Sequence, residues 1–143
     1  MTANEMERGR IMNVKRTCNL IVFAAGLAGA AGVALGAVAA HRVDEPGLAT
    51  AAQMLVLHAA AGVGIAAHLR SVHDRPMRAA LAWVAAAVLL IGGAALFAAD
   101  IALRGFTGSR LFPMAAPIGG STMIAGWIVL SIAALWGLPG RGK

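Results

Sequence analysis

The sequence contains an uncharged apolar run, residues 20–40, that is long enough to cross a lipid bilayer. A helix of that length measures roughly 30 Å, which matches the hydrocarbon core of a membrane. Further apolar runs follow it, at residues 48–68, 79–103 and 118–138. The four runs predict an all-α transmembrane four-helix bundle. It is flanked by a polar basic tail (1–19), for which we predict no fold, and by a short C-terminal tail (139–143).

Composition supports a membrane protein of one domain. Of the 143 residues, 59% are hydrophobic and 13% are charged, whereas soluble domains have about 45–50% apolar and about 25% charged residues. The net charge is +6, but the basic residues lie between the apolar runs and form no continuous face. We therefore expect contacts with the lipid bilayer and no binding of nucleic acid. The single cysteine, Cys18, excludes an intrachain disulfide and is expected to be an inert thiol.

The distribution of Lys and Arg predicts the orientation of the chain. Of the 12 Lys and Arg residues, only Arg42, Arg104 and Arg110 fall in the first and third loops between the runs, and the other nine fall on the opposite side. Because cytoplasmic segments carry the excess of Lys and Arg, both termini are expected to be cytoplasmic. The run 20–40 follows a basic segment, as a signal peptide would. It exceeds the about 7–15 apolar residues of a signal peptide, so we expect a retained helix.

Small residues on the first and last runs are candidates for helix packing. Gly32 and Gly36 form a Gly-x-x-x-Gly pair, and the last run offers Gly119, Gly120 and Gly126. Apolar burial does not drive helices together in lipid, whereas small residues let two backbones approach closely. We favour packing within one bundle, and a dimerisation face is the alternative. Pro117 is the last candidate of this set. It suits the first turn of the last helix, because its missing N–H costs nothing there.

Three ionisable residues fall in the same half of the predicted bundle: His41, His58 and Asp100. Two imidazoles and a carboxylate can bind a transition metal or pass a proton, which makes them a candidate functional cluster. A structural alternative exists for each residue. Asp100 can pair with Arg104 four positions on, His58 can hydrogen-bond to another helix, and His41 can cap a helix end. We expect Gln53 and His58 to face protein, because hydrocarbon offers them no partner.

No motif of a known reaction accompanies these residues. The spacing of the three is not a local ligand motif, and the sequence contains no phosphate loop, catalytic triad order or metalloprotease helix. We therefore expect no enzymatic activity, no metal and no cofactor.

Three segments resemble one known family. Residues 35–41 (LGAVAAH) are similar to a family segment L-G-A-F-G-A-H, and Gln53 through His58-Ala59 is similar to a Gln element that ends in His-Ala. The third segment runs from Leu96-Phe97 through Thr107-Gly108 and residues 117–120 (PIGG) to Gly126-Trp127. The chain thus resembles the domain-of-unknown-function 423 family, small YgdD-like inner-membrane proteins related to the animal transmembrane protein 256.

The resemblance implies a multi-pass protein of the bacterial inner membrane with no established activity. His41 and His58 match the family pattern, whereas Asp100 departs from it. We expect a non-enzymatic structural or accessory subunit of a membrane assembly, and its partners are either other membrane-protein subunits or further copies of the chain. The alternative is a small ion, proton or solute transporter that uses the membrane-embedded His residues.

Overall fold

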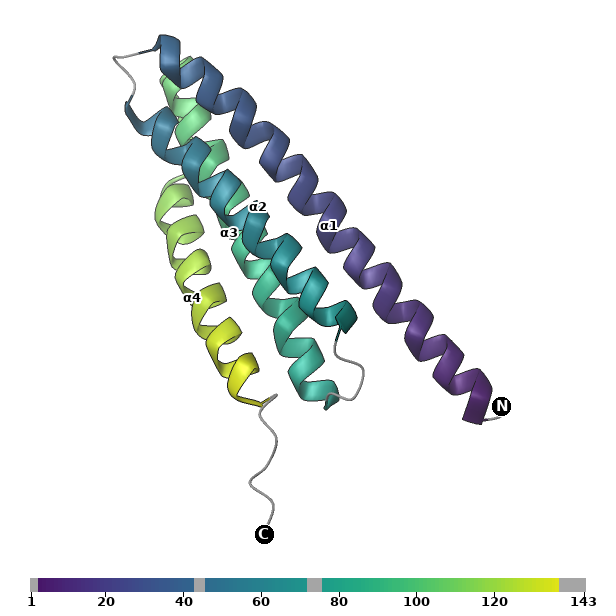
Figure 1. Ribbon diagram of the computed structural model, residues 1–143. Helices are drawn as coiled ribbons and strands as arrows, with labels where there is room; N and C mark the ends of the chain where they lie inside the picture. The colour runs from purple at the N-terminus through teal and green to yellow at the C-terminus, as the bar shows by residue number, and fades with distance from the viewer. Residues whose placement is uncertain (1–2, 43–45, 72–75, 137–143) are drawn as a thin grey trace.

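The computed structural model describes residues 3–42, 46–71 and 76–136 (Figure 1). These residues form four helices, α1 (Ala3–His41), α2 (Pro46–Ser71), α3 (Met77–Thr107) and α4 (Ala115–Trp136). Each helix packs against the next one in the chain, and α1 also touches α3. The predicted all-α four-helix bundle is confirmed.

Each helix is long and apolar enough to cross a membrane. The spanning stretches are Asn13–His41, Gly47–Ser71, Met77–Thr107 and Ala115–Trp136. They include nearly all of the four apolar runs of the sequence and extend some of them at the ends. Residues 137–143, which hold the predicted end of the fourth run and the C-terminal tail, lie outside the described residues.

The basic N-terminal segment is helical, although its sequence predicts no fold. Helix α1 begins at Ala3 and continues without interruption into the apolar run. The segment contains no proline, which would interrupt a helix. In Figure 1 this part of α1 extends beyond the other helices. The membrane-spanning stretch Asn13–His41 is therefore the later part of a longer helix.

The interior of the bundle is built mostly from small side chains, and large apolar side chains cover much of its surface. Nine alanines of the described residues are at most 1% exposed, among them Ala25, Ala51, Ala86, Ala87 and Ala94. Large apolar side chains point outward from all four helices, among them Phe23, Leu57, Val88 and Ile124. Soluble proteins rarely expose continuous apolar surface of more than a few hundred Å². Lipid is the environment that covers such a surface, and the chain is a multi-pass membrane protein.

Gly32 lies at the contact between α1 and α2. A Cβ atom at this position would lie 2.8 Å from Cγ2 of Val56 and 3.1 Å from the carbonyl oxygen of Ala52. Gly36, one turn later, is looser, with the Cβ of Ala52 at 3.7 Å. Gly32 thus lies where α1 and α2 of the same chain approach each other closely.

Glycines make the contact between α3 and α4 closer still. A Cβ on Gly119 would lie 2.6 Å from the backbone nitrogen of Phe97. A Cβ on Gly126 would lie 2.9 Å from the side chain of Leu90. Gly120 lies elsewhere, because a Cβ there would meet nothing within 4 Å. Pro117 is exposed in the first turn of α4, two residues after the helix begins at Ala115.

Side-chain contacts join neighbouring helices at the two ends of the bundle. At one end, Arg42 Nη1 donates to the carbonyl oxygen of Gly105 at 3.1 Å, which joins the ends of α1 and α3. At the other end, the rings of His68 and Trp83 stack with their centroids 4.0 Å apart. The guanidinium of Arg78 lies 6.0 Å from the ring centroid of Trp136 at the same end. The two tryptophans thus share one end of the bundle.

Cys18 lies in an apolar cluster near that end. Its side chain is 0% exposed, among residues that include Ile65, Leu69 and Ala86. Burial of this kind accords with the inert thiol that the sequence predicts.

Candidate functional site

His58 is the buried polar residue of α2, with 3% of its surface exposed. Its Nδ1 lies 2.7 Å from the carbonyl oxygen of Met54. A carbonyl can only accept, so Nδ1 carries the proton, and the unprotonated Nε2 accepts a hydrogen bond from Nε1 of Trp127 at 3.3 Å. Both ring nitrogens are thereby used within the protein, and the one lone pair available to a metal, on Nε2, accepts the bond from Trp127.

The bond between His58 and Trp127 joins two helices that do not otherwise pack closely. Helix α4 packs along α3, and among the described residues no backbone segment of α2 approaches it closely. The two rings meet edge to face, with centroids 6.1 Å apart and an interplanar angle of 61°. The predicted hydrogen bond from His58 to another helix is confirmed.

Asp100 is the second buried ionisable residue, also 3% exposed. Its Oδ1 accepts a hydrogen bond of 2.9 Å from the backbone N–H of Leu111, in the loop that connects α3 to α4. The predicted ion pair with Arg104 is wrong. Arg104 is exposed, and no ion pair joins it to Asp100. The chain reverses at Gly108, whose φ of 72° allows the turn, and this brings a backbone donor to the carboxylate instead.

His41 lies in the last turn of α1 and is exposed. The three candidates therefore have different surroundings: His58 binds Trp127, Asp100 binds the loop, and His41 faces outward. In the part of the chain that the structure describes, no three His, Cys, Asp or Glu side chains are grouped to hold a metal ion. A functional role for the cluster stays a prediction.

Gln53 does not face another helix of its own chain. Its side chain is exposed on α2, whereas His58 on the same helix is buried. Five positions separate the two, which places them about 140° apart around a helix of 3.6 residues per turn. One helix face cannot bury both.

A groove of about 520 Å³ runs between α1 and α3, with Leu55 of α2 at its base. Its lining contains only apolar residues, many of them alanines: Ala24, Leu27, Ala28, Ala31, Leu35, Leu55, Ile91, Ala95, Ala98, Ala99 and Ala102. No side chain in this lining offers a ligand to an ion or a polar solute.

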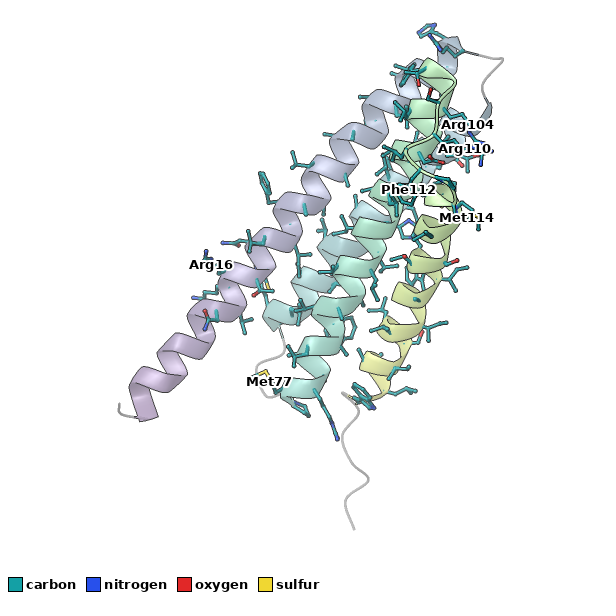
Figure 2. The ribbon with its side chains drawn as sticks, turned by 180° about the vertical axis from the view of Figure 1, so that it is seen from behind. Arg16, Met77, Arg104, Arg110, Phe112 and Met114 are labelled. Atoms are coloured by element: carbon teal, nitrogen blue, oxygen red, sulfur yellow. The ribbon has the colours of Figure 1, made fainter. Side chains whose placement is uncertain are left out.

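Charged residues lie toward the ends of the bundle. Figure 2 shows Arg104 and Arg110 near Phe112 and Met114 at one end, with Arg16 and Met77 toward the other. Basic side chains near both ends of an apolar middle suit the headgroup regions on the two faces of a membrane.

Sequence reasoning missed the partners of the buried polar groups. Trp127 lies in the middle of its apolar run, away from the interfaces where tryptophan is usual. An indole N–H at that depth requires an acceptor, and this signal points to a polar residue on another helix. The donor of Asp100, a backbone N–H of Leu111, has no comparable signal.

Four apolar helices and an interior with hydrogen-bonded polar groups define the chain as a multi-pass membrane protein of the helical-bundle class. A family model described as a protein of unknown function (DUF423) matches residues 35–120. The match covers more than half of the chain, and the chain belongs to this family. Neither the curated proteins nor the solved structures gave a match. The matched region contains His41, His58 and Asp100.

Proposed function

We propose that the chain is a non-enzymatic structural or accessory subunit of a membrane assembly. The observation that carries this proposal is the state of His58: its Nδ1 bonds to Met54 within α2, and its Nε2 accepts the bond from Trp127 that joins α2 to α4. Asp100 likewise holds a loop through Leu111. The groove beside α1 is lined by apolar side chains alone, which suits contact with helices or lipid better than passage of ions.

The proposed location is the bacterial inner membrane, with both termini in the cytoplasm. The excess of Lys and Arg on the side of the termini supports this orientation. A green fluorescent protein fused to the C-terminus is expected to fluoresce, and an alkaline phosphatase fused there is expected to be inactive. The reverse pattern would overturn the orientation.

Purification from native membranes tests the subunit role. The chain is tagged at its C-terminus, extracted in a mild detergent and analysed by quantitative mass spectrometry. We expect a second membrane protein in a fixed ratio, absent when an unrelated four-span protein carries the same tag. Repeated recovery of this chain without another protein would refute the role.

A small transporter is the alternative, and the burial of His58 within a spanning helix favours it. Ionisable groups at such positions are often part of proton or ion pathways. Proteoliposomes with a pH-sensitive dye inside measure proton flux for the native chain and for the variant with His41→Ala and His58→Gln. An unchanged flux in the double variant would exclude a pathway through these residues.

A further inference from the structure

One face of α2 carries exposed residues with a regular spacing. The positions follow each other at alternating intervals of three and four: Thr50, Gln53, Leu57, Ala60, Gly64, Ala67 and Ser71. This spacing has a period of 3.5 residues, which keeps one stripe facing a second helix in a left-handed pair. We name these seven residues the α2 seam. In Figure 1, α2 lies in front of α3, and one side of α2 faces away from the bundle.

The centre of the α2 seam is shaped for a close approach. Ala60, Gly64 and Ala67 have little or no side chain, and a Cβ on Gly64 would meet nothing within 4 Å. Glycine inside a helix costs about 1 kcal/mol relative to alanine, and no neighbour within the chain requires it here. In membranes, small residues at such a spacing let two helix backbones come into contact.

Gln53 places an unsatisfied polar group on the same stripe. Among the described residues its carboxamide has no hydrogen-bond partner. It lies six residues from the middle of the stretch Gly47–Ser71. That distance is about 9 Å, inside a hydrocarbon core with a half-thickness of about 15 Å. Lipid tails cannot bond to a carboxamide, so its exposure to lipid is unfavourable.

We propose that the α2 seam binds the α2 seam of a second copy of the chain, in a parallel pair around a two-fold axis along the membrane normal. Copies inserted with the same orientation have Gln53 at the same depth, so such an axis places the two Gln53 side chains opposite each other. A carboxamide both donates and accepts, and two of them satisfy each other reciprocally. A symmetric dimer requires a surface that is complementary to itself, and the α2 seam meets this requirement.

The dimer goes beyond the proposed function, because it forms whether or not another subunit binds. The seam leaves the groove between α1 and α3 free, since the groove uses Leu55 of α2 and none of the seam residues. A purification that yields no second membrane protein would therefore refute the subunit role and leave the dimer intact. A variant that no longer forms the dimer would leave the subunit role to be tested by the purification.

Cross-linking in native membranes locates the interface. Cys18→Ala removes the native thiol, and single cysteines are placed at Leu57 or Ala60 in the seam and at Val88 on the exposed face of α3. Oxidation is expected to give a covalent dimer at the two seam positions and none at Val88. Equal cross-linking at all three positions, a cross-link to a different protein, or no dimer at the seam would overturn the proposal.

Fluorescence energy transfer between labelled copies in liposomes then measures affinity by dilution with lipid. Gln53→Leu is expected to weaken the dimer about threefold to tenfold, as the loss of an interhelical hydrogen bond predicts. Gly64→Leu is expected to weaken it further by separating the backbones. Gly26→Leu on α1, where a Cβ also meets nothing within 4 Å, is the matched control and should leave the affinity unchanged.

Circular dichroism of all three variants shows whether the monomer still folds. We expect it to fold, because all three positions are exposed. Unchanged affinity in Gln53→Leu, with the fold retained, would overturn the reciprocal bond and the proposal with it.

Discussion

Gly93 and Gly119 face each other across the α3–α4 contact, each against the backbone of the other helix. A Cβ on either residue would lie 2.8 Å from the carbonyl oxygen of the other. Real Cβ atoms do not approach this closely, so only glycine fits at both positions. Helix α4 is therefore held on α3 through direct backbone contact.

The first prediction is that Gly119→Ala separates the two helices. A backbone cannot move aside as a flexible side chain does, and overpacking of this kind costs about 1–3 kcal/mol. We expect the free energy of unfolding in detergent, measured by circular dichroism, to fall by that amount. Gly120→Ala is the matched control, because its Cβ would meet nothing within 4 Å. Equal losses in the two variants would contradict the role of Gly119.

A second prediction concerns the bond from Trp127 to His58. Trp127→Phe keeps an aromatic ring but removes the donor, and it leaves Nε2 of His58 unsatisfied. Interhelical hydrogen bonds in membranes contribute about 0.6 kcal/mol on average and at most about 1.7 kcal/mol. We expect a loss in this range in the same unfolding assay. Trp136→Phe at the end of α4 provides the comparison, and a larger effect there would argue against the bond.

The third prediction separates Asp100 from Arg104. Asp100→Leu removes the acceptor of the Leu111 N–H and should cost about 1.5–3 kcal/mol, the range for hydrogen bonds to charged groups. Asp100→Asn keeps an acceptor oxygen and should retain most of the stability. Arg104→Ala should change the free energy of unfolding by less than about 0.5 kcal/mol, because the residue is exposed and unpaired with Asp100. A loss in Arg104→Ala as large as that in Asp100→Leu would restore the ion pair.

Met114 offers a stabilising substitution. It is the residue before α4, its φ is 71°, and its side chain is 60% exposed. A left-handed backbone is unfavourable for residues with a side chain, and glycine adopts it without this cost. Met114→Gly is therefore expected to raise the melting temperature. Gly108 allows the opposite substitution, because its φ is 72° and a Cβ added there would meet nothing within 4 Å. Gly108→Ala should lower the melting temperature, and a rise in that variant would contradict the backbone explanation.

The sequence predicted the elements that depend on local pattern. The four helices follow from four apolar runs, and the buried position of His58 follows from the cost of a bare imidazole in lipid. The exposure of Gln53 could also have been predicted from the sequence, because five positions of a helix separate it from His58 by about 140°. The error was to treat both polar residues as one face.

Other features depend on contacts between segments that the local sequence does not encode. The opposition of Gly93 and Gly119 is set by how far α4 slides along α3, and many registers bring small residues together. Asp100 has a favourable partner four positions on in Arg104, yet the reversal at Gly108 supplies a backbone donor that satisfies it in a buried site. The spacing in the sequence favoured an ion pair with Arg104, whereas the geometry of the loop places the N–H of Leu111 at the carboxylate of Asp100.

The close contacts of α1 with α2, and of α3 with α4, divide the chain into two helical hairpins. Each hairpin has its own glycine contact, at Gly32 in the first and at Gly93 with Gly119 in the second. During synthesis the first hairpin can thus form in the bilayer before α3 emerges from the ribosome. The second can then fold alone and dock through α2 and α3, while Trp127 reaches His58.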